Sequence, residues 1–151
     1  MDIKTAIFKY CNYQERCHSE VQNKLYELGA DTNEVNQLLV DMIEAGLLNE
    51  ERFARNYARG RFRIKHWGRM KIIQHLKQKK ISAYCIQKAM TEIDPNEYFE
   101  TAVKLCKRKL EELKKDKEIV RKNKAYRYLQ QKGYESSIIQ EILKDLLAKT
   151  S

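Results

Sequence analysis

The chain reads Leu25-Tyr26-Glu27-Leu28-Gly29 near its N-terminus, and the same pattern returns as Leu76-Lys77-Gln78-Lys79-Lys80 and as Leu129-Gln130-Gln131-Lys132-Gly133. The three leading leucines lie 51 and 53 residues apart. Apolar residues also coincide downstream: Val35, Ile86 and Ile139 share one position, and Leu39, Met90 and Leu143 share another. A recurrence at this period predicts three tandem copies of one helical unit.

Apolar residues follow helical spacing along most of the 151 residues. Segments 35–43, 86–93, 99–113 and 139–147 carry apolar side chains at intervals of three and four residues. One proline, five glycines, 34% charged and 42% hydrophobic residues are typical of an ordered helical protein. No segment has a convincing strand pattern, so we predict an all-α fold.

The three copies are expected to span residues 1–48, 49–94 and 95–151. A unit of about fifty residues is too small to bury a self-sufficient core, so each copy must gain stability by stacking on a neighbour. We therefore expect three tandem three-helix repeats that form an elongated, curved helical array. Such a surface suits a long, periodic partner better than a small substrate.

Helix stop and start signals agree with three units. Gly29 and Gly133 lie where a helix must end in a left-handed turn. Lys80 occupies the same place in the second copy, where a left-handed turn would cost a non-glycine residue ~1 kcal/mol. Segment 94–97, Asp-Pro-Asn-Glu, combines an N-cap, an early proline and a capping-box glutamate. The third helices are expected to be capped by Thr32, Ser82 and Ser136.

The middle of the chain contains no acidic residue between Glu51 and Glu92. This acid-free segment, residues 52–91, holds twelve basic side chains: Arg52, Arg55, Arg59, Arg61, Arg63, Lys65, Arg69, Lys71, Lys77, Lys79, Lys80 and Lys88. The net charge of the whole chain is only +9, so the remainder is slightly acidic. Such segregation predicts a face that binds a polyanion. The alternative is an ordinary solvated surface, but such surfaces usually mix both signs.

A second basic tract runs from Lys104 to Arg127 and differs from the first, because four acidic residues lie within it: Glu111, Glu112, Asp116 and Glu118. Charges three or four residues apart can pair along a helix, and each pair is worth about 0.2–0.5 kcal/mol. We therefore interpret this tract mainly as a solvated helical face.

The junction of the first two copies carries the most recognisable residues. It reads Asn49-Glu50-Glu51-Arg52-Phe53-Ala54 and, further on, Gly68-Arg69-Met70-Lys71-Ile72-Ile73-Gln74-His75-Leu76-Lys77-Gln78-Lys79-Lys80-Ile81. Together with Glu20-Val21, Lys24-Leu25 and Gly29 upstream, and Leu129 with Lys132-Gly133-Tyr134 downstream, it resembles the RecX family of bacterial regulatory proteins. The chain departs from the family pattern at three positions: Lys80 for glycine, Cys17 for a capping serine and Tyr134 for phenylalanine.

The resemblance covers essentially the whole chain and implies both a fold and a function. Members of the family consist of three tandem three-helix repeats and modulate RecA, the recombinase that polymerises on single-stranded DNA. They are thought to lie in the helical groove of the RecA–DNA filament and to oppose its growth, ATP hydrolysis and strand exchange. The resemblance therefore implies the RecA filament as the main partner, with single-stranded DNA as a secondary partner through phosphate contacts.

Nothing in the sequence predicts a membrane partner. No apolar run approaches the ~18–20 residues needed to span a bilayer, and Met1-Asp2-Ile3-Lys4 does not resemble a secretory signal. The four cysteines are scattered, mostly at apolar helix positions, as expected of reduced thiols in a core: Cys11, Cys17, Cys85 and Cys106. We expect a cytoplasmic, monomeric protein.

The candidate binding residues lie in the first part of the acid-free segment. Arg52, Arg55 and Arg59 share one helical face, where they could contact phosphates or acidic residues of a partner. Five further basic residues lie close to Trp67 in sequence: Arg61, Arg63, Lys65, Arg69 and Lys71. Guanidinium and indole groups could hold a nucleic-acid backbone and stack on a base. The alternative for Trp67 is a structural plug between helices.

Catalytic and metal-binding hypotheses find little support. The three histidines are well separated, and Cys11, Cys17 and His18 have no second pair at zinc-like spacing. The sequence has no phosphate-binding glycine loop and no carboxylate in the acid-free segment to hold magnesium. We therefore expect no enzyme activity, no cofactor and no metal. Two alternatives to a RecA regulator stay open: a sequence-nonspecific nucleic-acid-binding helical protein that acts without a recombinase, and a pure protein scaffold.

Overall fold

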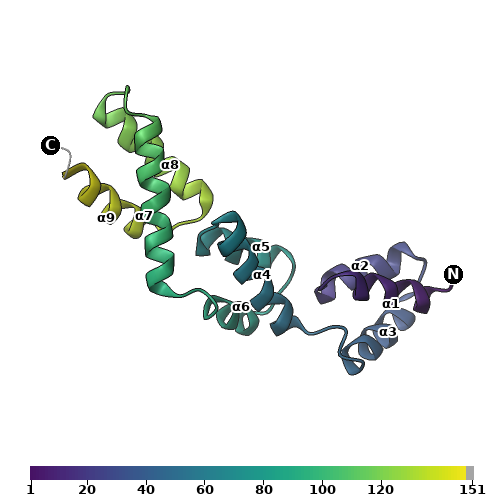
Figure 1. Cartoon of the computed structure of the whole chain (residues 1–151). Helices are drawn as coiled ribbons and strands as arrows, with labels where there is room; N and C mark the ends of the chain where they lie inside the picture. Colours follow the sequence, from purple (N-terminus) through teal and green to yellow (C-terminus); the bar gives the residue numbers. More distant parts are fainter. Residues whose placement is uncertain (149–151) are drawn as a thin grey trace. The chain divides into compact units, whose positions relative to one another are not determined.

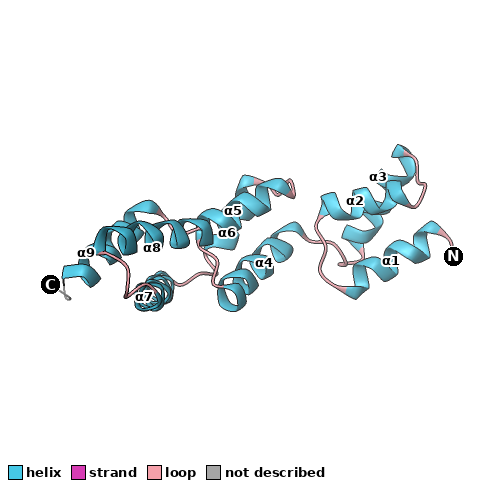
Figure 2. Cartoon of the chain, turned by 90° about the horizontal axis from the view of Figure 1, so that it is seen from above, coloured by secondary structure: helices cyan, strands magenta, loops and turns pink. Residues whose placement is uncertain are grey.

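The computed structural model describes residues 1–148, and every regular element in this range is an α-helix (Figures 1 and 2). The helices are α1 (Ile3–Tyr13), α2 (His18–Glu27), α3 (Thr32–Glu44), α4 (Glu50–Lys65), α5 (Arg69–Gln78), α6 (Ala83–Met90), α7 (Pro95–Glu112), α8 (Glu118–Lys132) and α9 (Ser136–Ala148). They follow one another as three groups of three. The prediction of an all-α chain of three-helix repeats is confirmed.

The same turn ends the second helix of each repeat. Its left-handed residue is Gly29 (φ 96°), Lys80 (φ 63°) or Gly133 (φ 104°). The next amide donates back to the carbonyl of the leucine five residues earlier: Ala30 to Leu25 at 3.0 Å, Ile81 to Leu76 at 3.1 Å and Tyr134 to Leu129 at 3.1 Å. This bond satisfies a carbonyl that the helix leaves without a partner. The repeated pentads in the sequence are therefore repeated helix ends, and Lys80 adopts the left-handed conformation that the alignment predicts.

The helix starts follow the sequence in part. The Asp94 carboxylate accepts the Glu97 amide at 2.9 Å, and the Ser82 hydroxyl accepts the Cys85 amide at 3.2 Å, as predicted. The predicted caps at the other two third helices are wrong by one residue. Asp31 caps α3 by accepting the Glu34 amide at 2.9 Å, and the Ile139 amide donates to the carbonyl of Glu135, which precedes α9. Adjacent polar residues made these positions ambiguous, because several side chains cap helices well.

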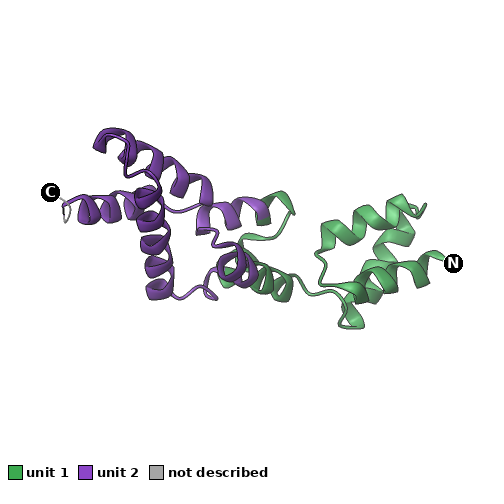
Figure 3. Cartoon of the chain, turned by 45° about the horizontal axis from the view of Figure 1, so that its top comes forward, with its two compact units in different colours: residues 1–57, 76–89 green, residues 58–75, 90–151 purple. Residues whose placement is uncertain are grey.

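The chain packs as two compact units (Figure 3). The first unit contains residues 1–57 and 76–89, and the second contains residues 58–75 and 90–151. The boundaries between them fall inside α4, inside α5 and before the last residue of α6, so both units draw on the second repeat. The division into repeats at residues 48/49 and 94/95 stays a prediction.

Each unit has an apolar interior. The leucines of the helix-end pattern, Leu25, Leu76 and Leu129, have no exposed surface. All four cysteines are also buried as unpaired thiols, as the sequence predicts. Burial raises the pKa of the Cys106 thiol to about 11. Among residues 1–148, none of the helices has both the length and the apolar composition needed to cross a lipid bilayer.

In the second unit, the turn before α5 lies directly against the turn after α8. The Gly68 amide donates to the Lys132 carbonyl at 2.7 Å, and the Met70 amide donates to the Gly133 carbonyl at 2.8 Å. A Cβ atom on Gly68 would lie only 2.3 Å from the Gly133 carbonyl carbon. Gly68 lies between α4 and α5, and the reason for glycine there is this close approach of two backbones.

Candidate nucleic-acid interface

The nine predicted site residues are divided between the two units. Arg52 and Arg55 belong to the first unit, whereas the other seven belong to the second: Arg59, Arg61, Arg63, Lys65, Trp67, Arg69 and Lys71. The first half of α4 thus carries two of the predicted contacts. The second half of α4, the turn that follows it and the start of α5 carry the rest.

Carboxylates from outside the acid-free segment neutralise at least six of its twelve basic side chains. The ion pairs are Arg52–Glu15 at 2.7 Å, Arg55–Glu51 at 3.0 Å, Arg59–Glu92 at 2.9 Å, Arg63–Glu97 at 4.0 Å, Arg69–Glu135 at 2.8 Å and Lys79–Glu20 at 3.2 Å. Such partly exposed pairs contribute about 0–1 kcal/mol each to stability. Their larger effect is electrostatic, because each pair removes most of a positive charge from the surface field.

The predicted arginine face of α4 is therefore already occupied by acidic partners. The Arg52, Arg55 and Arg59 side chains are 39%, 31% and 43% exposed, so a binding partner could still reach them. It would do so by exchanging its own anion for a carboxylate of the chain. Such an exchange replaces one ion pair by another, so it adds little net binding energy.

The structure does bring Trp67, Arg61 and Lys71 together. The Arg61 guanidinium carbon lies 5.3 Å from the indole centroid, and the Lys71 Nζ lies 4.4 Å from it. The His75 ring packs 4.6 Å away, tilted by 57°. The indole is half-buried and its neighbours are groups of its own chain. This arrangement favours the plug over the stacking platform, because a base could stack only after these side chains moved.

The turn that carries Trp67 is held from the third repeat. His66 adopts φ 58°, a left-handed conformation that is strained for a residue with a side chain. Its carbonyl accepts the Tyr134 hydroxyl at 2.8 Å, and the neighbouring Lys65 carbonyl accepts the Lys132 ammonium at 3.1 Å. Sequence reasoning missed His66. The enrichment of histidine in left-handed positions was the only local signal.

Arg69 belongs to a part-buried polar cluster with Tyr98 and Glu135. The Arg69 amide donates to the Tyr98 hydroxyl at 2.9 Å, and its guanidinium lies 4.0 Å from the Tyr98 ring centroid and 2.8 Å from the Glu135 carboxylate. The Tyr98 hydroxyl in turn donates to Glu135. Burial, and then the hydrogen bond to Glu135, raise the pKa of Tyr98. Arg69, predicted as a partner contact, therefore fastens the start of α5 to α7 and to the turn before α9.

Lys65 and Lys71 keep their charges available to a partner. Within residues 1–148, neither ammonium has a carboxylate at ion-pair distance, and Lys65 is exposed. The same described range contains no group of three histidine, cysteine or acidic side chains placed to hold a metal ion. The chemistry that the site offers is the binding of anions by lysine and arginine.

Repeated three-helix units define an all-helical repeat protein, and comparisons with known proteins identify its family. The family models "RecX, second three-helix domain" and "RecX, third three-helix domain" match residues 49–90 and 96–143. Regulatory protein RecX of Pelodictyon phaeoclathratiforme is 30% identical over 147 residues, which cover 95% of this chain and 88% of that protein. The chain belongs to the RecX family, as its motifs predict.

Other relatives agree. Regulatory protein RecX of Limosilactobacillus reuteri is 30% identical over 141 residues, or 93% of this chain, and the chain spans about half of that protein, 53%. That of Clostridium botulinum is 27% identical over 146 residues, covering 95% of this chain and 68% of that protein. The crystal structure of RecX from Lactobacillus salivarius shares the fold, with a TM-score of 0.86 at 24% identity over 95% of this chain and 94% of that one. A second crystal structure, of regulatory protein RecX, has a TM-score of 0.85 at 29% identity, and the match covers 95% of this chain and 70% of that one.

Proposed function

We propose that this protein binds the filament that RecA forms on single-stranded DNA, lies in the filament's helical groove, and inhibits filament growth, ATP hydrolysis and strand exchange. The observation that carries the proposal is membership of the RecX family along nearly the whole chain. Its place is the cytoplasm, in DNA repair by homologous recombination, where it acts as a monomer by binding and without catalysis.

The contacts would use the cationic residues of α4 and of the start of α5, up to Lys71. Lys65 and Lys71 have no acidic partner among the described residues, so they add attraction for a polyanion without breaking an existing pair. The paired arginines Arg52, Arg55 and Arg59 contribute mainly by steering, because exposed charges change association rates more than affinity. RecA would supply protein walls to this surface, and its bound DNA would supply phosphates.

The test measures ATP turnover by RecA from the same source, assembled on single-stranded DNA, while the chain is added below one molecule per RecA. We expect turnover to fall at these ratios. A protein that only competes for free DNA would need amounts comparable to the DNA sites, so inhibition at low ratios points to the filament. Unchanged turnover at every ratio would remove the proposal.

A second candidate is a sequence-nonspecific nucleic-acid-binding helical protein that acts without a recombinase. The excess of basic residues favours it, since the chain has 30 lysines and arginines against 21 acidic residues. With six to eight phosphate contacts, the logarithm of affinity for single strands should fall with the logarithm of salt at a slope of about −4 to −6. Inhibition of RecA turnover at low ratios, together with tight association with RecA, would exclude this candidate, because it acts without a recombinase.

A further inference from the structure

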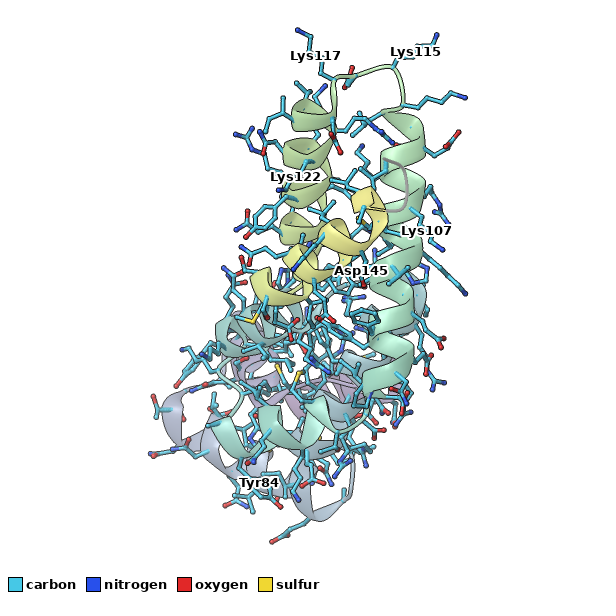
Figure 4. All side chains as sticks on the ribbon, turned by 90° about the vertical axis from the view of Figure 1, so that its left-hand side faces the viewer. Tyr84, Lys107, Lys115, Lys117, Lys122 and Asp145 are labelled. Atoms are coloured by element: carbon cyan, nitrogen blue, oxygen red, sulfur yellow. The ribbon has the colours of Figure 1, made fainter. Side chains whose placement is uncertain are left out.

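The first two helices of the third repeat are longer than their counterparts. α7 has 18 residues and α8 has 15, against 16 and 10 for α4 and α5 and 11 and 10 for α1 and α2. α7 and α8 pack together as a hairpin that closes through residues 113–117. Nearly all residues from 111 to 120 are exposed, and Figure 4 shows Lys115 and Lys117 projecting from this end.

The hairpin carries a surplus of positive charge that its own acids do not neutralise. Residues 104–127 contain eleven basic and four acidic side chains. Three acids are used in local pairs: Lys109–Glu112 at 3.4 Å, Lys114–Glu111 at 3.5 Å and Lys124–Asp116 at 3.0 Å. Arg121 donates to the Leu110 carbonyl at 3.0 Å. Within residues 1–148, seven exposed cations have no carboxylate at ion-pair distance: Lys104, Lys107, Arg108, Lys115, Lys117, Lys122 and Arg127.

The distribution of charge in the first and third repeats argues against one common mode of DNA binding. Two helices joined by a short turn can place the helix after the turn in the major groove of duplex DNA. Here that helix is acidic in two repeats, because α3 carries three acidic and no basic residues and α9 carries two acids and one lysine. The cations of the third repeat lie on α7, α8 and the turn between them, so contacts with phosphates are favoured over contacts with base edges.

The distribution of the cations suits an extended polyanion. The 18 residues of α7 make a helix of about 27 Å, which is long enough to lie along several phosphates of a single strand. The seven cations are spread along the hairpin instead of being gathered in one pocket. Lys107 and Arg108 line a hollow of about 570 Å³ against α9, and Lys122 lines another of about 800 Å³ on the α8 side. In Figure 4, Lys107 on α7 and Lys122 on α8 extend on either side of α9.

We propose that the end of the α7–α8 hairpin, residues 104–127, binds the phosphodiester backbone of single-stranded DNA without reading base sequence. This interaction rests on the proposed function and deepens it by locating its nucleic-acid contact, but it is a property of the chain alone. It can therefore be measured without RecA. If the chain does not bind single-stranded DNA through this hairpin, the proposed binding to RecA can still be correct. If the chain does not inhibit RecA, the proposed DNA binding by the hairpin can still be correct.

The experiment measures fluorescence anisotropy of a labelled thirty-nucleotide oligothymidylate with the full chain, from 50 to 300 mM NaCl. If all seven cations contact phosphates, the wild-type salt slope is about −5. The hairpin variant replaces Lys107, Lys115, Lys117 and Lys122 by glutamine, and its slope should be about −2. The matched control makes the same change at four exposed lysines of the first unit: Lys4, Lys9, Lys77 and Lys80. The control loses the same net charge but none of the seven hairpin cations, so its slope should stay within about 1 of wild type.

Four results would overturn the proposal. Three of them are an absence of binding by the wild-type chain at 50 mM NaCl, an unchanged salt slope in the hairpin variant, and a reduction of the salt slope in the control as large as that in the hairpin variant. Melting curves check that each variant folds. A second variant with only Lys115→Gln and Lys117→Gln, both in the turn, serves as a milder version of the hairpin variant. If the hairpin variant keeps its DNA affinity but loses its effect on RecA turnover, the surface binds an acidic protein face, and the proposal is wrong.

Discussion

Gly68 and Gly133 approach so closely that a Cβ atom on Gly68 would lie 2.3 Å from the carbonyl carbon of Gly133. Two backbone hydrogen bonds, of 2.7 and 2.8 Å, accompany the approach. The turn that carries Trp67 is therefore positioned by the end of α8. The predicted binding residues around Trp67 depend on the third repeat for their arrangement.

The contact predicts a large effect of Gly68→Ala. An added methyl group would meet backbone atoms, which cannot rotate away as a side chain can. We expect the free energy of unfolding, measured by urea denaturation, to fall by about 3 kcal/mol. Gly60→Ala is the control, because Gly60 lies inside α4 and a Cβ atom there would have nothing within 4 Å. Gly60→Ala should raise the free energy of unfolding by about 0.5–1 kcal/mol, because alanine has a higher helix propensity than glycine. Equal stability of the two variants would contradict the packing argument.

The left-handed residue of the second repeat predicts a stabilising substitution. Lys80 has φ 63° where the other two repeats have glycine. Lys80→Gly should raise the free energy of unfolding by up to about 1 kcal/mol, because the strain relieved exceeds the added flexibility of the unfolded chain. Gly29→Ala makes the opposite change, at φ 96° and with no atom in contact, and should lower stability by about 1 kcal/mol. A less stable Lys80→Gly variant would show that the lysine side chain contributes more than the strain.

Tyr98 and Tyr134 predict the response to alkaline pH. Burial, aided at Tyr98 by Glu135, raises the pKa of both phenols above their ordinary value of about 10. The unfolded chain then loses these protons first, so their contribution to stability is complete below about pH 10 and declines as pH rises further. Each phenol contributes a slope that approaches about 1.4 kcal/mol per pH unit only well above pH 10, so its total loss between pH 9 and 11 is about 1.4 kcal/mol. Urea unfolding should therefore show a decrease in stability between pH 9 and 11 that is smaller by this amount in Tyr98→Phe. A decrease equal to that of wild type would argue against the buried phenol.

The cluster around the indole predicts that Trp67→Ala acts on stability. Loss of a half-buried ring with two cations near its centroid should lower the free energy of unfolding by about 2 kcal/mol. Trp67→Phe keeps an aromatic ring, so it should lower the free energy of unfolding by less than half as much as Trp67→Ala. Thermal melting and oligonucleotide binding are measured on the same samples. Unchanged melting with weakened binding would instead support the stacking platform.

The helices and their ends could be predicted from sequence because they depend on local relations. The bond from Ala30 to Leu25 spans five residues, and its copies at Leu76 and Leu129 repeat the same pattern at the same spacing. An alignment of three pentads therefore carries enough information to predict a left-handed Lys80. The family resemblance rests on the same local patterns.

The electrostatics could not be predicted in this way. Arg69 and Glu135 are 66 residues apart, and Arg52 meets Glu15 although α2 and α3 lie between them in the sequence. A count of acids within a segment misses partners that folding brings from elsewhere. It made the acid-free segment look more positive than its surface is. The same count also failed to predict the seven unpaired cations of residues 104–127. The four acidic residues in that tract suggested that its charges cancel, whereas three of these acids each pair with a single lysine nearby.

The sharing of the second repeat between two packing units restricts how such a protein can change in length. In a simple solenoid, a terminal repeat can be lost and its neighbour needs only a new cap. Here Phe62 of α4 packs on Tyr98 of α7, with ring centroids 5.7 Å apart, and the strained carbonyl of His66 is held by Tyr134. A gene shortened before α7 would thus encode a middle repeat in which Phe62 and the His66 carbonyl have lost these partners, and natural selection would tend to keep or discard the two repeats together.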